Sequence, residues 1–443
     1  MKNERKDFIV IGAALFALFF GAGNLIFPPA LGLLSGENWL LCMFGFLLTG
    51  VGLPILGVIT LSKAGGSIND LADKVHPVFA KVIGTITVLA IGPLLAIPRT
   101  GATVYEIGVQ PLFGDIHPLI VSVIYFSITL FFVIKPSGII DKIGKILTPI
   151  LLAVISTIII KGVFFPISTP IVTGIANPFS KGFLDGYQTM DALGSIVLGG
   201  IVLVSLKEKG YLGKKEQLRM TKKAGLLAGA CLTFVYGGLL YLGATVSGVF
   251  EVGISKSELI IAITDNILGS MGQIGMCVAV SAACLTTSIG LTAVVGNYFE
   301  DLTKGKLSYK SIVIGTSVFS TIISVIGVEQ IVKFSVPLLV LVYPVAILLI
   351  VLNLFDDYIK SNNVYKGAVF GAIIVSTFDA LAAMNINIEF ANSLIARLPF
   401  ASSGFAWIVP AVVCGIGMGL IPERDGMKKA SRLRTSPLTN ILK

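Results

Sequence analysis

Residues 16–29 read FALFFGAGNLIFPP and lie inside the first long apolar segment of the chain. Two glycines, an asparagine and two prolines cannot continue as one unbroken helix, because glycine leaves the backbone loose and proline lacks an N–H donor. Backbone groups freed by a break in hydrocarbon must face a water-filled cavity, buried protein or a bound solute. Close helix packing would explain the glycines alone, but it requires neither the amide of Asn24 nor the prolines. The segment therefore predicts a broken helix that supplies half of a binding site.

The composition places this break in a membrane protein. The chain has 443 residues, of which 55% are hydrophobic and only 13% are charged, and its mean hydropathy is +0.92. These values lie far outside the range of soluble domains. The first apolar segment is too long for a signal-peptide core and lacks a small-residue cleavage site, so we expect the mature protein to begin at or near Met1. The five cysteines are widely spaced in apolar segments, which predicts packing residues rather than disulfides or a zinc site.

Twelve apolar segments are long enough to cross a bilayer. We predict transmembrane helices at residues 8–33, 38–62, 78–98, 118–134, 143–165, 187–206, 224–249, 270–299, 311–328, 334–354, 365–384 and 401–421. Counted against these helices, 27 Lys and Arg residues fall on the side of the N-terminus and six on the other side. The largest clusters are Lys207 to Lys223, with seven, and Arg424 to Lys443, with six, and Lys135 to Lys145 is one of several with three. The positive-inside rule then places both termini in the cytoplasm, so the net charge of +9 reflects topology and not a nucleic-acid partner.

A second break is predicted in the sixth helix, where residues 187–195 read YQTMDALGS. A carboxylate, hydroxyl and amide groups gather there just before a glycine. Asp191 could instead cap the helix at the outer surface, a role that Asp fills well. However, the first and sixth helices are five spans apart and occupy matching positions in two five-helix halves of inverted topology. Paired interrupted helices at such positions indicate a transporter's binding site near the middle of the bilayer.

Three adjacent hydroxyl side chains lie in the eighth helix, at Thr286, Thr287 and Ser288, and Gly290 follows them. Each alone could bond back to the carbonyl four residues earlier. A run of three suits a small hard cation better, because hydroxyl oxygens and the freed carbonyls of a broken helix can ligate sodium without a buried net charge. The run therefore predicts a cation site.

Other charged residues in or beside the apolar segments have more than one interpretation. Arg99 is an isolated charge at the end of the third predicted helix. Its place near the outer boundary favours a gate or a structural pairing over direct substrate contact. Residues 251–268 have an apolar face and a charged face, which predicts an amphipathic lid over the outer vestibule or a helix at the membrane interface. Asp379 is a lone acid that could bond another helix, and Asp379 or Asp191 could carry a proton in a rival mechanism.

Three motifs resemble the bacterial branched-chain amino acid carrier family, which contains cation symporters for leucine, isoleucine and valine. They are GAGNLIFPPALG at residues 21–32, AIPRTGAT at 96–103 and TMDALG at 189–194. Length and the number of spans are also similar, so the resemblance extends over essentially the whole chain. The family belongs to the wider group with the leucine-transporter fold. The resemblance implies an all-α polytopic membrane protein with a 5+5 inverted repeat, broken helices 1 and 6, and two peripheral helices.

The resemblance also implies roles for individual residues. The implied substrate-binding residues are Ala22, Gly23, Asn24, Thr189, Asp191 and Ala192. The first three would offer backbone groups to the substrate carboxylate, and the last three would hold its ammonium group and line the side-chain pocket. The implied sodium ligands are the carbonyls of Ala17, Phe20 and Cys284 and the hydroxyls of Thr287 and Ser288. The spacing between Gly23 and the proline of the first helix differs by one residue from the pattern of the fold. The implied sodium ligands Ala17 and Phe20 could therefore each be displaced by one position along the chain.

We therefore predict a secondary active transporter, not an enzyme, that imports leucine, isoleucine and valine across the bacterial cell membrane by sodium-coupled symport. Residues 1–165 would form the first five-helix repeat, and residues 166–354 the second, with the lid at 251–268. Residues 355–443 would form two peripheral helices and a basic cytoplasmic tail. The alternatives are proton coupling on the same scaffold and an ion channel. Sodium is the expected coupling ion, the lipid bilayer is the expected surrounding, and no obligatory protein partner is inferred.

Overall fold

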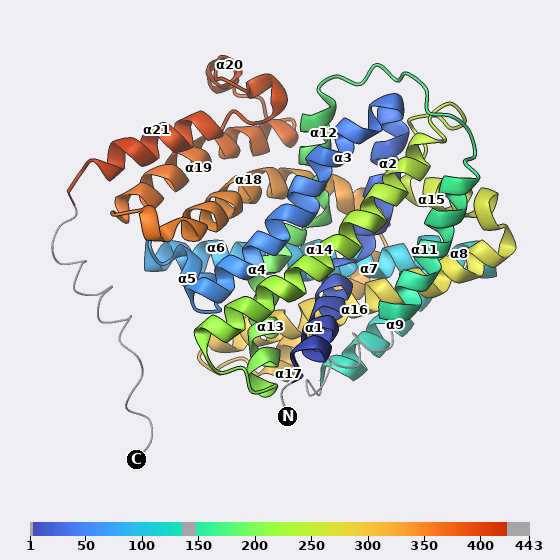
Figure 1. Cartoon of the computed structure of the whole chain (residues 1–443), viewed down its shortest axis with the longest axis horizontal. Helices are drawn as coiled ribbons and strands as arrows, with labels where there is room; N and C mark the ends of the chain where they lie inside the picture. Colours follow the sequence, from blue (N-terminus) through green and yellow to red (C-terminus); the bar gives the residue numbers. More distant parts are fainter. Residues whose placement is uncertain (1–2, 135–147, 423–443) are drawn as a thin grey trace.

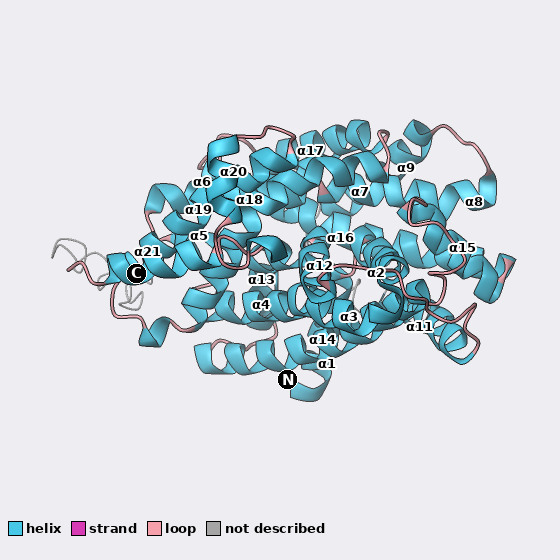
Figure 2. Ribbon diagram, turned by 90° about the horizontal axis from the view of Figure 1, so that it is seen from above, coloured by secondary structure: helices cyan, strands magenta, loops and turns pink. Residues whose placement is uncertain are grey.

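The computed structural model describes residues 3–134 and 148–422. All regular secondary structure in these two ranges is helical, and the helices are stacked in several crossing layers (Figure 1). The view from above shows the same all-helical arrangement (Figure 2). The predicted basic clusters at 135–145 and 424–443, and the predicted start of the fifth helix at 143–147, lie outside the described residues.

The first half of the chain is built from helices joined largely by tight turns. These helices are α1 (Glu4–Phe19), α2 (Ala22–Ser35), α3 (Trp39–Leu47), α4 (Leu53–Ala64), α5 (Ile68–Ala72), α6 (Pro77–Leu89), α7 (Ala96–Thr103), α8 (Gln110–Phe113), α9 (Pro118–Val133) and α11 (Thr148–Phe164). Three π-helical turns, at Leu48–Gly52, Ala90–Leu94 and Val104–Val109, join α3 to α4, α6 to α7 and α7 to α8. As a result, α6, α7 and α8 form one long span.

The second half follows the same plan. Its helices are α12 (Pro178–Asp185), α13 (Asp191–Glu208), α14 (Lys214–Ala244), α15 (Lys256–Leu268), α16 (Ser270–Leu302), α17 (Tyr309–Ser324), α18 (Val328–Leu354), α19 (Asn363–Ala383), α20 (Glu389–Ala396) and α21 (Ile408–Gly419). A 3-10 turn at Gly186–Thr189 lies between α12 and α13. The helices α19 and α21 pack on each other, and α19 packs on α18, at one side of the molecule (Figure 1, orange and red).

Several helical runs are long and apolar enough to cross a membrane. Within the described ranges these are Ala22–Ala64, Pro77–Phe113, Lys214–Ala244, Ser270–Leu302, Val328–Leu354 and Asn363–Ala383. The pair Pro178–Thr189 and Asp191–Glu208 forms a further span that is bent by 42°. Each of the twelve predicted segments falls on one of these runs or on another helix. The predicted all-α polytopic fold with broken helices 1 and 6 is therefore confirmed.

Three predicted helix boundaries are wrong. The third helix was expected at 78–98, but the span runs on to Phe113 with a kink at Gly92, whose backbone leaves the helical conformation. The sixth span begins at Pro178 instead of residue 187. The seventh helix begins at Lys214 instead of residue 224. Its first ten residues include four Lys together with Glu216, Gln217 and Arg219. These residue types form helices well but are missed by a search for apolar residues.

The break in the first helix lies at Phe20 and Gly21, about two turns before the prolines. Phe20 leaves the helical conformation, with ψ of 91°, and Gly21 is extended. The amide of Gly21 donates to the side-chain oxygen of Asn24, so a side chain replaces the helical bond that is lost there. Pro28 and Pro29 lie within α2, which continues through them to Ser35. The predicted break is therefore confirmed, and the glycine and asparagine mark its position.

Helix α14 packs closely against the broken first helix. It contacts both α1 and α2. A Cβ atom added at Gly243 of α14 would lie 2.0 Å from the carbonyl oxygen of Pro29, and one added at Gly32 of α2 would lie 2.0 Å from the carbonyl oxygen of Leu240. The two backbones approach this closely only because glycine stands at both positions.

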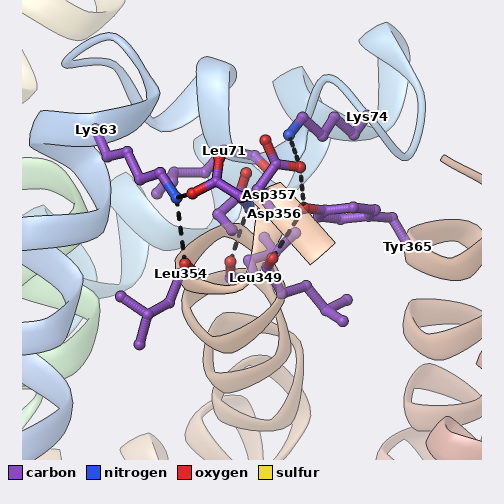
Figure 3. A network of polar contacts seen from close by, with 10 residues as sticks. Lys63, Leu71, Lys74, Leu349, Leu354, Asp356, Asp357 and Tyr365 are labelled. Atoms are coloured by element: carbon purple, nitrogen blue, oxygen red, sulfur yellow. Dashed lines mark hydrogen bonds and ion pairs between the residues drawn. The ribbon is translucent and has the colours of Figure 1, made fainter. Parts of the chain in front are cut away.

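A polar network joins the end of α4 and the segment after it to the end of α18 (Figure 3). Lys63 forms an ion pair with Asp357 at 2.7 Å, and Lys74 pairs with Asp356. The buried amide of Asn353 donates to the carbonyl oxygen of Leu71 at 2.8 Å. The network therefore links the two halves of the chain at one end of the helices.

Candidate functional site

The breaks in the first and sixth helices meet at one small cavity. Gly21, Ala22 and Asn24 line it from the first break, and Thr189 and Asp191 line it from the second. The second break arises where the residue before Asp191 adopts a left-handed conformation, with φ of 63°, and ends the 3-10 turn before α13 begins. Residues of α7 and α16 complete the lining. The predicted meeting of two interrupted helices is therefore present.

Asp191 is held in the cavity wall by two neutral donors. Its side chain is only 4% exposed. Asn24 Nδ2 donates to the carboxylate at 2.6 Å, and the hydroxyl of Tyr236 on α14 donates to the same oxygen at 2.9 Å. Asn24 Nδ2 also contacts the Tyr236 hydroxyl. The alternative in which Asp191 caps a helix at the outer surface is wrong, because the carboxylate is buried and bonded to two other helices.

Arg99 lies in the interior, well before the end of its span. Its side chain is 3% exposed and lines the cavity from α7. Nη1 donates to the backbone carbonyl of Gln188 at 2.8 Å, and the guanidinium carbon lies 5.6 Å from the centre of the Phe27 ring. The side chain of Gln188 in turn accepts a hydrogen bond from Ser335 of α18 at 3.0 Å. Arg99 therefore lies in the cavity wall instead of near the outer boundary where it was expected, and its role as a gate, a structural pairing or a substrate contact stays a prediction.

The three hydroxyls of α16 do not all face the first helix. Thr286 Oγ1 lies 3.0 Å from the carbonyl oxygen of Ala17, and Thr287 donates to the carbonyl of Leu18 at 3.3 Å. Ser288 donates instead to Thr129 of α9 at 3.4 Å. Successive residues of a helix are rotated by about 100°, so three adjacent side chains cannot share one face. The structure brings Thr286 and Thr287 to the broken helix.

The remaining predicted ligands lie near these groups. Phe20 stands at the break itself, where its backbone leaves the helix, and Cys284 is fully buried on α16, three residues before Thr287. Gly23 lies against Arg99, since a Cβ atom there would come within 2.7 Å of Nη2. Ala192 is fully buried at the start of α13, next to Asp191. Their proposed roles in binding stay predictions.

Sequence reasoning missed several polar partners of the site. Tyr236 is the clearest, since it bonds the carboxylate and is fully buried. The available signal was a tyrosine hydroxyl within an otherwise apolar helix. No sequence pattern, however, connects Tyr236 with Asp191, which lies 45 positions earlier in the chain. Ser335 was missed for the same reason, and so was the bond between Arg99 and the carbonyl of Gln188, a residue of the predicted second break.

Within the predicted amphipathic segment 251–268, residues 256–268 form the helix α15. It packs its apolar face against α2, α11 and α16. At its start, Ser257 donates to Glu106 at 2.6 Å, and the other carboxylate oxygen of Glu106 accepts the backbone N–H of Val328 at 2.8 Å. Glu106 therefore joins α15 to the first residue of α18. A role of α15 as a lid stays a prediction.

Comparison with known proteins identifies relatives along almost the whole chain. Residues 4–424 match the family described as branched-chain amino acid transport protein. The branched-chain amino acid permease BraB of Bacillus subtilis is 42% identical over 92% of this chain and 94% of its own length. The branched-chain amino acid transport system 2 carrier protein of Pseudomonas aeruginosa is 37% identical over 92% and 96%, and the permease BrnQ of Escherichia coli is 34% identical over 92% and 94%. These relatives are named as transport proteins, not as enzymes.

Solved structures share the fold. An inward-facing structure of Mhp1 has a TM-score of 0.59 and 13% sequence identity, and the match covers 96% of this chain and 91% of the other. A sodium-coupled sialic acid symporter in a substrate-bound, outward-open state has a TM-score of 0.55 and 15% identity, with coverage of 94% and 90%. At this level of identity the likeness establishes the leucine-transporter type of fold and nothing about the substrate.

Proposed function

Because the chain belongs to the branched-chain amino acid transport protein family, we propose that it imports leucine, isoleucine and valine into the cell by sodium-coupled symport. The observation that carries the proposal is the meeting of Asn24 and Asp191, from two interrupted helices, at one buried cavity. Interrupted helices at the midplane present unpaired backbone groups and helix-end dipoles to a charged solute.

The lining of the cavity suits an aliphatic zwitterion. The carboxylate of the amino acid would meet the first turn of α2 at Ala22, Gly23 and Asn24. The ammonium group would lie at the turn of Thr189, Asp191 and Ala192, where Asp191 supplies negative charge. The aliphatic side chain would contact the apolar part of the lining, which includes Leu18, Phe19, Ile91, Leu198 and Leu291. Small apolar pockets discriminate weakly between ligands that differ by one methylene, so one site can serve all three amino acids.

The sodium ion would be bound between α1 and α16. The predicted carbonyls of Ala17 and Phe20 fit this place, since Ala17 already lies 3.0 Å from the Thr286 hydroxyl. On α16 we propose the hydroxyls of Thr286 and Thr287, with a carbonyl of the preceding turn at Ala283 or Cys284. Thr286 replaces Ser288 of the predicted set, because Ser288 turns toward α9. Such a set supplies only hard oxygen ligands, as sodium requires.

Transport would follow alternating access. One group of helices around the two breaks would rock against the rest and expose the same cavity first to one side and then to the other. The distribution of Lys and Arg supports an orientation with both termini in the cytoplasm.

Proton coupling is the second candidate, and the buried carboxyl of Asp191 favours it, since a carboxyl in an apolar wall can carry a proton. Uptake of labelled leucine into proteoliposomes separates the two mechanisms. We expect an inward sodium gradient without a pH gradient to drive accumulation, and a pH gradient without sodium to drive none. Accumulation driven by the pH gradient alone would support the proton mechanism and contradict sodium coupling.

A further inference from the structure

We propose that Arg99 binds the carboxylate of the substrate and thereby makes the transporter select amino acids over amines. The inference rests on the proposed function and names a recognition group that the predicted substrate site lacked. Three observations lead to it: the burial of the charge, its unused hydrogen-bonding capacity, and its position beside the first turn of α2.

A buried guanidinium requires compensation. Arg99 is 3% exposed, and burying a charge is costly unless it is paired and hydrogen-bonded. In the described part of the chain no carboxylate lies within ion-pair distance of it, and the nearest acid of the cavity, Asp191, is already bonded to Asn24 and Tyr236. The charge of Arg99 therefore has no bonded counter-ion among the described side chains.

The guanidinium also has donors to spare. Nη1 bonds the carbonyl of Gln188, whereas Nε is buried without any hydrogen-bond partner. A purely structural pairing with one carbonyl would use a single donor of the five that arginine carries and would not require a charge. A planar fork with free donors matches a carboxylate, which accepts two parallel bonds from it.

The position of Arg99 adds a second anion-binding element. Nη2 would lie 2.7 Å from a Cβ atom at Gly23, so the guanidinium lies directly against the first turn of α2. That helix has 14 residues, and the N–H groups of its first turn point out of the helix end. Arg99, Ala22 and Asn24 line the same cavity. A carboxylate placed there would meet a full positive charge and a helix N-terminus together, while Asp191 provides the opposite charge for the ammonium group.

The test compares leucine with leucinamide, in which a neutral amide replaces the carboxylate. Binding is measured on the purified full chain from the ligand-induced rise in melting temperature, and wild-type binding is checked by competition against labelled leucine uptake. We expect the wild type to bind leucine roughly 100-fold more tightly than leucinamide. Arg99→Gln should reduce leucine affinity by about that factor and change leucinamide affinity by less than about threefold, so the preference disappears.

Two further variants keep the test decisive. Arg99→Lys retains the charge but not the fork, and we expect it to lower the preference about 10-fold; this variant decides the matter if Arg99→Gln does not fold. Ser335→Ala removes the hydrogen bond to the side chain of Gln188 but leaves the guanidinium of Arg99 intact. The preference for leucine over leucinamide should therefore stay as in the wild type. Equal weakening of both ligands by Arg99→Gln, or an unchanged preference in Arg99→Lys, would mean that Arg99 only holds Gln188. A wild type that binds and transports no leucine would overturn the proposed function itself, and this inference with it.

Discussion

Asp191 remains in an apolar surrounding because two neutral side chains donate hydrogen bonds to one of its oxygens. Asn24 approaches from the first helix and Tyr236 from α14, at 2.6 and 2.9 Å. Removing one partner of a buried carboxylate leaves the remaining charge poorly solvated, which typically costs more than the bond contributes. Each of the two donors should therefore affect transport more than an ordinary polar residue does.

Removal of the Tyr236 hydroxyl tests this dependence. We expect Tyr236→Phe to lower leucine affinity about 10-fold, since a hydrogen bond to a charged group contributes about 1.5–3 kcal/mol. The measurement is the leucine concentration that gives half-maximal uptake in proteoliposomes. Tyr241→Phe is the matched control on the same helix, because its ring packs against Trp39, away from the cavity. Equal effects of the two substitutions would contradict the assigned role of the Tyr236 hydroxyl.

The three hydroxyls of α16 give a second test at the residue scale. We expect Thr286→Ala and Thr287→Ala each to raise the sodium concentration for half-maximal uptake about 10-fold, because each removes an oxygen ligand from a site with few ligands. Ser288→Ala should change this concentration by less than about twofold, because its hydroxyl faces Thr129. A large effect of Ser288→Ala with none of Thr286→Ala would restore the ligand set implied by the resemblance alone.

Among the helices, α14 supports the broken first helix by direct backbone contact. Gly243 and Gly32 permit that contact, and Tyr236 extends from the same helix to Asp191. The position of the break is thus fixed by α14 as well as by its own sequence. A change in the spacing of α2 and α14 should disturb both the fold and the cavity.

A methyl group at this contact measures how tightly the two helices are held. Gly243→Ala would place a Cβ atom 2.0 Å from the carbonyl oxygen of Pro29, and we expect a loss of about 1–3 kcal/mol of stability or more, as for overpacked cores. The measurement is thermal unfolding of the purified protein in detergent. Gly315→Ala is the control, because a Cβ atom there meets nothing within 4 Å in the middle of α17. It should be neutral or slightly stabilising; a comparable loss there would show that the effect is not specific to the contact.

At the scale of the whole molecule, one polar network connects segments that are almost 300 residues apart in the chain. Asn353 bonds Leu71 across 282 positions and is buried, whereas the Lys63–Asp357 pair is largely exposed on its acidic side (Figure 3). Buried hydrogen bonds and exposed ion pairs contribute differently to stability, since solvent screens the second kind. The amide should therefore hold the two halves of the chain together more strongly than the ion pair.

Two alanine variants separate these contributions. We expect Asn353→Ala to destabilise the protein by about 1–3 kcal/mol, because it leaves the carbonyl of Leu71 without its partner. Lys63→Ala should cost less than about 1 kcal/mol. Thermal unfolding of both variants in the same detergent gives the comparison. A larger effect of Lys63→Ala would show that the ion pair, and not the amide, carries the connection.

The sequence predicted the fold well because its main signals are local. Apolar segments mark the spans, and the glycine, asparagine and aspartate near the breaks mark where two helices are interrupted. The length of the third span could not be read in the same way, because the chain kinks at Gly92 and then resumes a helical course to Phe113. The partners of the site were also hidden, since Tyr236 meets Asn24 across 212 positions and no local pattern records such a contact.

Both the oxygen and the nitrogen of the Asn24 side-chain amide form hydrogen bonds, and these bonds link the proposed binding of the amino acid to the proposed binding of the ion. Its oxygen accepts from Gly21 at the break, where a Cβ atom would lie 2.9 Å from the Thr287 hydroxyl, and its nitrogen donates to Asp191. If leucine binds at Asp191 and sodium binds beside Thr287 as proposed, the solute would order the backbone at the ion site, and the ion would order the wall that receives the solute. Thermodynamic linkage requires the effect to be equal in both directions: by whatever factor sodium tightens leucine, leucine tightens sodium.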